Sequence, residues 1–238
     1  MTESDGALLR GMKAILTKRS DAGRGLSLVT LEPPEELRNL YAVPGQYIEI
    51  QASTRGYFVL AGEVGAPSWQ LLVRSQGGVS EELTEAHEGT AFEVSAPLGK
   101  GFPSANRHGQ ALILAVVGSA LGAARPILRE RLARRDGALP RLYLGVRSLS
   151  EIPLSDEINA WVRDGVRVVL CLSQEFGEPV MPDAMRLEHG YVQDVIARDF
   201  RNGRLGGACI FAAGPAGMMD ALRALASDGL GVDVHTNA

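Results

Sequence analysis

The order in which short apolar segments follow one another constrains the fold of this chain more than any other feature. Over the first hundred residues, runs such as "GMKAILTKRS", "LSLVTLEP", "QYIEIQA" and "WQLLVRS" are separated by Gly, Pro, Asp and Asn. Short strands at this spacing are typical of a small antiparallel β-barrel or sandwich. One helix is expected within this part, at "VSEELTEAH".

The pattern changes after "PSANRHGQ", where apolar runs begin to alternate with segments of helical periodicity. Such alternation indicates β-α-β units, which form a parallel sheet with helices on both faces. Strands are expected at residues 111–117, 141–146, 166–172, 208–213 and near 232–235. Helices are expected at residues 123–134, 155–163, 191–201 and 215–227. The sequence therefore predicts a two-domain chain, with a β-barrel over residues 1–107 and a five-strand α/β domain over residues 108–238.

Charge and hydropathy exclude several classes of partner. The formal net charge is -4 and the basic residues are scattered, so no surface for a nucleic acid is predicted. The longest apolar run, around residues 111–117, is far shorter than the ~20 residues that span a bilayer. The N-terminal segment "MTESDGALLRGMK" lacks the pattern of a signal peptide, and a cytoplasmic location is therefore expected.

The residue types that bind metals are few and poorly spaced. The two cysteines, Cys171 and Cys209, lie in apolar, strand-like runs and are expected to be buried thiols. The four histidines show no metal-ligand spacing with one another or with the cysteines. No metal site is predicted, and an iron-sulfur cluster held by this chain is excluded by its ligand count. No G-x-S-x-G or Walker sequence is present, so hydrolase and kinase activities are not indicated.

Four short motifs occur in a fixed order. "RGYF" at residues 55–58 follows "GQYIEI", and "GGVS" at residues 77–80 opens the expected barrel helix. "GSALGA" at residues 118–123 precedes Arg125, and "AGPAGMM" ends the fourth strand of the α/β half. With these motifs in this order, the sequence resembles the ferredoxin-NADP reductase family of flavoproteins over nearly its whole length. The resemblance implies transfer of electrons from NADH or NADPH through bound FAD to an acceptor.

The first two motifs would bind FAD by this resemblance. Arg55 can hold the pyrophosphate with a planar guanidinium, and the turn that opens the helix can donate backbone N–H groups. Tyr57 can lie against the flavin ring, whereas Phe58 contributes packing but no acid or base. The full set of implied flavin contacts is Arg55, Gly56, Tyr57, Phe58, Leu72, Val73, Arg74, Gly77, Gly78, Val79 and Ser80. A solvated strand charge at Arg55 or Arg74, and an ordinary helix cap at residues 77–80, are the competing interpretations.

The last two motifs would bind the pyridine nucleotide. Gly118, Ser119 and Ala120 are small enough to let a pyrophosphate approach the backbone between a strand and a helix. The same small residues would also allow simple packing of the helix on the sheet. Gly214 and Pro215 fall where the resemblance places the nicotinamide, although Pro is common in the first turn of any helix.

A further pair, Arg147 and Ser148, falls where the adenosine ribose would lie. The arginine suits a 2′-phosphate but can equally pair with Glu151 or Asp156, so the choice between NADH and NADPH stays open.

Four positions depart from the family pattern. Phe58 replaces a Ser or Thr that would hydrogen-bond the flavin, and Ala213 replaces a Cys. Ala120 and Ala123 change the nucleotide turn, where a Gly at position 120 could adopt a positive φ without steric cost. These departures favour a second hypothesis, a reductase-like electron-relay or scaffold subunit with weak or no NAD(P)H oxidation.

The electron acceptor is expected to be external, because the chain has no cluster ligands of its own. A ferredoxin-like protein, a partner subunit and a small molecule are the alternatives.

Overall fold

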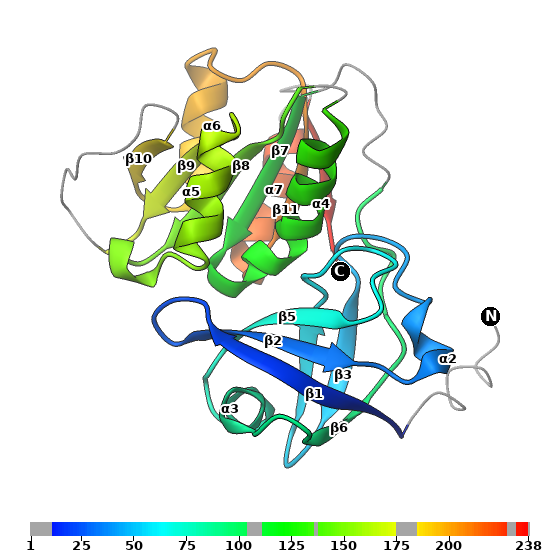
Figure 1. Cartoon of the computed structure of the whole chain (residues 1–238). Helices are drawn as coiled ribbons and strands as arrows, with labels where there is room; N and C mark the ends of the chain where they lie inside the picture. The colour runs from blue at the N-terminus through cyan, green and yellow to red at the C-terminus, as the bar shows by residue number, and fades with distance from the viewer. Residues whose placement is uncertain (1–10, 104–110, 136–137, 175–184, 228–231, 238) are drawn as a thin grey trace.

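The computed structural model describes residues 11–103, 111–135, 138–174, 185–227 and 232–237. The described chain forms two stacked parts, a β-barrel and an α/β unit, each built around its own six-stranded sheet (Figure 1). An antiparallel sheet followed by a parallel sheet with helices confirms the predicted fold class. The predicted domain boundary near residue 108 lies outside the described residues.

The first sheet is antiparallel, with the strand order β4-β3-β6-β1-β2-β5. Its strands are β1 (Met12–Asp21), β2 (Leu26–Glu32), β3 (Tyr47–Gln51), β4 (Arg55–Val59), β5 (Trp69–Arg74) and β6 (Ala91–Val94). An isolated bridge between Leu60 and Leu71 joins the end of β4 to β5, and this bridge closes the sheet into a barrel.

Two helices accompany the barrel, α2 (Glu35–Arg38) and α3 (Val79–Glu85). Helix α3 is the predicted one, and it buries Val79 and Leu83 among the side chains of the barrel core. Helix α2 was not predicted, because a single turn of four residues is too short to show helical periodicity.

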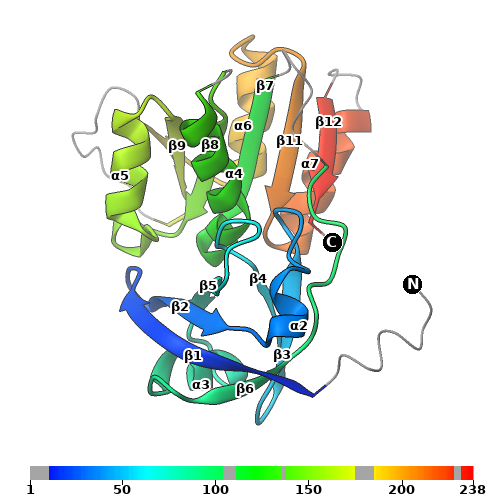
Figure 2. The ribbon, with the colours of Figure 1, turned by 45° about the vertical axis from the view of Figure 1, so that its right-hand side comes forward.

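The second sheet is parallel throughout, with the order β10-β9-β8-β7-β11-β12. Its strands are β7 (Ala111–Val117), β8 (Arg141–Val146), β9 (Arg167–Leu172), β10 (Met185–His189), β11 (Ala208–Ala213) and β12 (Val232–Thr236). Its helices are α4 (Leu121–Arg134), α5 (Ser155–Arg163), α6 (Val192–Arg201) and α7 (Ala216–Ser227), with short 3-10 turns η1 (Gly118–Ala120) and η2 (Leu149–Glu151). Helices α4 and α5 cover one face of the sheet, and α6 and α7 cover the other (Figures 1 and 2).

The prediction of five strands in the parallel sheet was wrong by one, because β10 forms a sixth strand at the edge. Strand β10 pairs only with β9 and has the sequence "MRLEH", which mixes apolar and charged residues. An edge strand is not buried on all sides, so it lacks the continuous apolar run that marked the other parallel strands.

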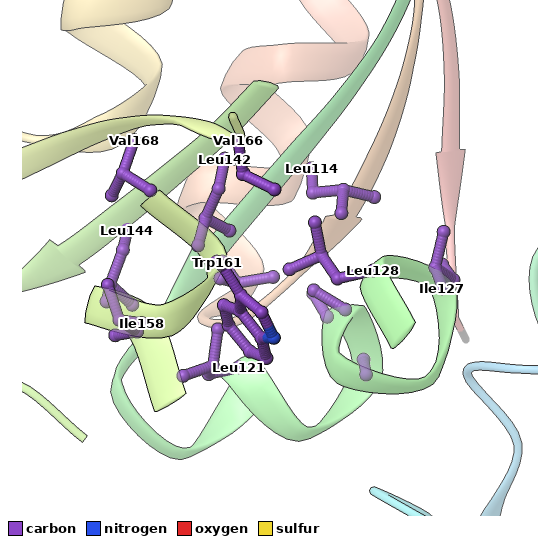
Figure 3. Packing of buried hydrophobic residues seen from close by; sticks show 14 of the residues in the cluster. Leu114, Leu121, Ile127, Leu128, Leu142, Leu144, Ile158, Trp161, Val166 and Val168 are labelled. Atoms are coloured by element: carbon purple, nitrogen blue, oxygen red, sulfur yellow. The ribbon is translucent and has the colours of Figure 1, made fainter. Parts of the chain in front are cut away.

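Alternate residues along the strands of the parallel sheet point to opposite faces and pack into two separate hydrophobic cores. Leu114 and Leu142 pack with Trp161 of α5 on one face (Figure 3). Ile113 and Tyr143 pack against α6 and α7 on the other face. This alternation is what a parallel sheet covered on both faces requires. None of the helices in the described ranges is both long enough and apolar enough to cross a membrane.

The first of these cores continues into the barrel and fixes the two parts together. Ala61 and Leu72 of the barrel belong to the same buried cluster as Leu121 and Leu114 of the α/β part. Phe102, which follows the barrel, stacks on Phe211 of β11 with 4.7 Å between ring centres and an angle of 2°. The relative position of the two parts therefore rests on apolar burial as well as on polar contacts.

Candidate functional site

A pocket of about 650 Å³ lies at the carboxyl edge of the parallel sheet. The chain runs from β7 outward through β8 and β9 to β10, and then returns to place β11 on the other side of β7. Loops on the two sides of such a switch point diverge, and the crevice between them is the usual ligand site of an open α/β sheet. The pocket lining includes residues that follow β7, β8, β10 and β11, together with Arg74 and Gln76 from the barrel.

The turn after β7 forms the floor of this pocket. Gly118 adopts a φ of +53°, a left-handed conformation in which a β-carbon is costly. Gly118, Ser119 and Ala120 all line the pocket, and no side chain caps the start of α4. The first N–H groups of a helix have no intrahelical partner, so this turn presents hydrogen-bond donors to an anion.

Arg74 reaches from the end of β5 toward the same turn. Its Nη2 lies 3.8 Å from the position that a β-carbon on Gly118 would occupy, and its Nη1 donates to the main-chain oxygen of Arg24 at 3.4 Å. The same Nη2 lies 3.7 Å from the carboxylate of Glu151, which follows β8. Arg74 therefore lines the pocket and pairs with Glu151, and its contact with a flavin stays a prediction.

Arg147 also lines the pocket and forms an ion pair with the same Glu151. Its Nε donates to Oε2 at 3.0 Å, and its Nη2 lies 3.0 Å from Oε1. This pairing is one of the two that the sequence left open, since Asp156 is not the partner. Ser148 does not line the pocket, and its hydroxyl lies 2.9 Å from that of Ser150.

Gly214 and Pro215 line the pocket at the end of β11, facing the turn after β7. A β-carbon on Gly214 would lie 2.9 Å from Cε of Met218 and 3.4 Å from Cβ of Val117. The glycine thus lets β11 and the following helix approach β7 closely. The first and last nucleotide motifs, about a hundred residues apart in the sequence, meet across one pocket.

The flavin candidates on β4 alternate in direction, as strand residues do. Arg55 and Tyr57 are exposed, and the Tyr57 ring makes an edge-to-face contact with Tyr47 at 5.8 Å. Gly56 and Phe58 face the barrel, where a β-carbon on Gly56 would lie 2.6 Å from Val79 and 2.9 Å from the Phe58 ring. The Nε of Arg55 lies 3.4 Å from Oε1 of Glu49 and donates to Oε1 of Gln51 at 3.5 Å. Its two Nη groups make no hydrogen bond to the residues that the structure describes.

Some hydrogen-bonding groups of the loop at residues 77–80 are satisfied within the protein. The Ser80 hydroxyl donates to the main-chain oxygen of Gly77 at 2.8 Å and accepts the N–H of Gln76 at 3.0 Å. The N–H of Val79 donates to Oγ1 of Thr54 at 2.8 Å. Ser80 and Val79 thus shape the loop, whereas the space beside Gly77 is open, with no atom within 4 Å of its missing β-carbon.

Leu72 and Val73 are buried in the two cores and do not line the 650 Å³ pocket. Their backbone pairs with β2 on one edge. Beyond the Leu60–Leu71 bridge, the other edge of β5 pairs with no further strand among the described residues. Any flavin contact from Leu72 and Val73 is therefore made by main-chain atoms.

Cys171 borders the pocket but is 1% exposed. Burial raises the pKa of its thiol to about 12, so the thiol stays protonated and is not a nucleophile. No group of three metal-binding side chains occurs in the part of the chain that the structure describes. A second pocket, of about 550 Å³, lies beside α4 and contains none of the candidate residues.

Comparison with solved structures identifies the architecture. The cytochrome P450 reductase GcoB of Amycolatopsis superposes with a TM-score of 0.74 and 23% identity, covering 96% of this chain and 70% of that one. The ferredoxin NADP+ reductase of Neisseria gonorrhoeae, solved with FAD and NADP, gives a TM-score of 0.73 at 12% identity, over 96% of this chain and 99% of that one. The chain has the two-domain fold of the ferredoxin-NADP reductases.

Sequence comparison adds one distant relative to this reductase fold. The gamma subunit of sulfhydrogenase 2 from Pyrococcus furiosus is 26% identical over 156 residues, which cover 64% of this chain and 53% of that protein. The match thus spans about half of the relative's length. No protein-family model matches the chain.

Within the reductase fold, three departures from the family pattern are compatible with the backbone around this pocket. Ala120 has φ -65° and ψ -8°, an ordinary right-handed conformation. The backbone at this position therefore does not require a glycine. Ala123 and Ala213 are buried and do not line the pocket. The backbone of the turn is therefore intact despite these alanines.

Several residues of the site were missed by sequence reasoning. Thr54, which supports the 77–80 loop, and Gln76 gave no signal because each is a single polar residue in a turn. Tyr191 is 62% exposed and lines the 650 Å³ pocket at the start of α6. An exposed aromatic after an edge strand could have been noticed in "GYVQDVI", had β10 been predicted.

Proposed function

We propose that this chain is a flavin-dependent oxidoreductase that passes electrons from NADH or NADPH, through FAD, to an external acceptor. The observation that carries the proposal is the shared pocket. Gly118 and Gly214 meet there with Arg74, which lies on the barrel strand that leads to the Gly77–Ser80 loop. The proposed nucleotide half, residues 108–238, and the proposed flavin half, residues 1–107, thus have one cleft in common.

The residues on the barrel fit FAD in both charge and shape. Arg55 is exposed and has free donors for a pyrophosphate, and Tyr57 presents an exposed ring that can cover the flavin. Gly77 leaves open space beside the start of α3. Bound FAD would accept two electrons from a nicotinamide and release them singly or in pairs.

The pocket fits a pyridine dinucleotide for related reasons. The uncapped start of α4 and the guanidinium of Arg74 supply converging positive groups for the pyrophosphate. Gly214 and Pro215 lie across the pocket from this turn, where the nicotinamide would approach the barrel. These protein groups position the cofactors, which is the main contribution of a protein to cofactor chemistry.

The acceptor is proposed to be a ferredoxin-like protein, a partner subunit or a small molecule. The chain has two cysteines, too few to hold a four-thiolate cluster of its own. The sulfhydrogenase relative is named as a subunit of a larger enzyme, which supports a partner subunit.

The same relative supports a second candidate, an electron-relay or scaffold subunit with weak or no oxidation of NAD(P)H. Phe58 favours this candidate. A phenyl ring cannot hydrogen-bond a flavin, and the ring faces Gly56 and Val79 within the barrel. The intact backbone of the nucleotide turn favours the enzyme.

One spectroscopic experiment distinguishes the candidates. The purified chain is incubated with FAD, desalted and examined by absorption, and NADH or NADPH is then added without oxygen. A flavin spectrum that bleaches supports the oxidoreductase, and a flavin spectrum that neither nucleotide bleaches supports the relay. Failure to retain FAD would contradict the oxidoreductase and the electron relay, and would favour a scaffold subunit that binds no flavin.

A further inference from the structure

We propose that Glu151 makes this pocket selective for NADH over NADPH, by pairing with one edge of the Arg147 guanidinium and placing a negative charge where a 2′-phosphate would bind. The inference rests on the proposed binding of a pyridine nucleotide and names which of the two nucleotides is accepted. Glu151 is a residue whose role the sequence motifs did not assign.

Arg147 and Glu151 lie where the adenosine ribose of a bound nucleotide is expected. Arg147 and Glu151 follow β8, the strand next to β7 in the sheet and the next one along the chain. In doubly wound sheets the adenosine ribose lies at the end of this second strand, where an acidic residue accepts the 2′-hydroxyl or an arginine receives the 2′-phosphate. This chain has one residue of each kind at the site, and their pairing decides between the nucleotides.

The pair occupies the Nε–Nη2 edge of the Arg147 guanidinium, one of the two edges by which an arginine can receive a phosphate. Both Glu151 oxygens are engaged, with Oε2 3.0 Å from Nε and Oε1 3.0 Å from Nη2 of Arg147. Arginine binds carboxylates and phosphates through the same planar fork, so the two anions compete for it. The Glu151 side chain is 14% exposed, against 58% for Arg147, so the carboxylate is the better shielded partner.

A second arginine holds Glu151 in the pocket from the other side. Nη2 of Arg74 lies 3.7 Å from Oε2 of Glu151 and beside Gly118. A 2′-phosphate brought to Arg147 would meet the Glu151 charge at close range in a partly desolvated site, where like charges repel strongly. Arg74 itself keeps positive charge near the turn, so the pyrophosphate common to both nucleotides still finds a partner.

The loop that carries Glu151 is fastened to the barrel and resists displacement. Leu154 donates its N–H to the main-chain oxygen of Ala22 at 2.8 Å. A β-carbon on Gly23 would lie 2.8 Å from the main-chain oxygen of Ile152, which shows how closely the loop rests on the β1–β2 turn. Moving Glu151 aside for a phosphate would therefore disturb this contact between the two parts.

The test measures binding of two fragments, ADP-ribose and 2′-phospho-ADP-ribose, by titration calorimetry at one fixed ionic strength. Neither fragment carries a nicotinamide, so the result is independent of flavin reduction. We expect the wild-type chain to bind ADP-ribose about tenfold more tightly, and Glu151→Gln to abolish or reverse this preference. A ratio of two affinities on one sample is insensitive to the fraction of folded protein.

Glu130→Gln is the matched control. Glu130 also forms an ion pair with an arginine one turn away, Arg134 at 2.7 Å, but lies outside this pocket. Glu130→Gln removes the same charge as Glu151→Gln and should leave the preference for ADP-ribose unchanged. Tighter wild-type binding of the 2′-phosphorylated fragment, or an unchanged ratio in Glu151→Gln, would overturn the inference and leave the proposed function standing. Binding of neither fragment by the wild type would reject nucleotide binding as well.

Discussion

Nη1 of Arg125 donates to the main-chain oxygen of Ala61 at 2.8 Å, and this bond joins the helix that follows the nucleotide turn to the barrel. The same atom donates to Oε1 of Gln70 at 2.6 Å, and Nε contacts both oxygens of Glu157 at 2.9 and 3.0 Å. Arg125 is 2% exposed, so this charge is buried at the junction of the two parts, with its Nε and Nη1 donors engaged.

Arg125→Ala should destabilise the whole chain. The substitution leaves the buried oxygens of Ala61 and Gln70 without their donor, and loss of one partner from a buried ion pair typically costs about 3–5 kcal/mol. Urea unfolding followed by tryptophan fluorescence measures the change. The control is Arg129→Ala, whose side chain is 35% exposed and also pairs with Glu157. If Arg129→Ala lowered the free energy of unfolding as much as Arg125→Ala, the special role of Arg125 in holding the two parts together would be contradicted.

Arg74→Ala and Arg55→Ala should separate the two cofactor sites. Arg74 lies beside Gly118, so its loss should weaken ADP-ribose binding by about tenfold while FAD retention changes little. Arg55 lies on the exposed side of β4, so its loss should weaken FAD binding and leave ADP-ribose affinity unchanged.

Calorimetry with ADP-ribose and FAD retention after desalting give the two measurements for both variants. Each variant is thus the control for the other. Unchanged FAD affinity in Arg55→Ala would remove Arg55 as the pyrophosphate anchor, and equal effects of both variants on both ligands would indicate a general loss of structure.

Gly78→Ala should damage the flavin loop more than Gly77→Ala. Both glycines have positive φ, at +56° and +86°, so both substitutions carry backbone strain of about 1–2 kcal/mol. Only at Gly78 would the new methyl group clash with Oγ1 of Thr54, which accepts the N–H of Val79. The midpoint temperature of thermal unfolding and the retention of FAD should both be lower in Gly78→Ala than in Gly77→Ala. Equal losses in the two variants would show that strain alone matters.

Asp199→Asn should remove part of the acid sensitivity of the fold. Asp199 is fully buried, and burial alone would raise its pKa. Hydrogen bonds from Arg186 and from the Tyr143 hydroxyl, at 2.6 Å, outweigh this effect and lower the pKa of the carboxyl below its usual value. A lowered pKa in the folded state stabilises the fold above the pKa of the unfolded chain, about 4, and this contribution is lost as the pH falls.

Urea unfolding at a series of pH values from 7 to 3 tests this prediction. At pH 7 the variant should be less stable by about 1–3 kcal/mol, because the buried site loses its charged hydrogen-bond acceptor. Arg186 keeps its ion pair with Glu188, at 3.2 Å. The difference should shrink at acidic pH, where the wild-type carboxyl becomes protonated. A difference that stays constant across the series would mean that Asp199 does not titrate as described.

The two-part architecture could be read from the sequence because it depends on local periodicity. Apolar alternation and β-branched runs gave the strands of both sheets, and β7, β8 and β11 have the predicted bounds. Strand β10 was missed because an edge position demands less burial, and its residues carry a weaker pattern. The motif positions at Gly118 and Gly214 came instead from the resemblance to the ferredoxin-NADP reductase family.

The contacts between distant residues were decided by the tertiary structure alone. The sequence could name Arg74, Arg147 and Glu151, but not that one carboxylate lies between the two guanidiniums. Nor could it show that Ala120 needs no left-handed backbone, since the turn places that demand on Gly118 instead. Periodicity is a property of neighbouring residues, whereas ion pairs across a pocket depend on how two folded parts pack. The sequence by itself therefore determined the two halves and their order, and only their packing decided which charges meet.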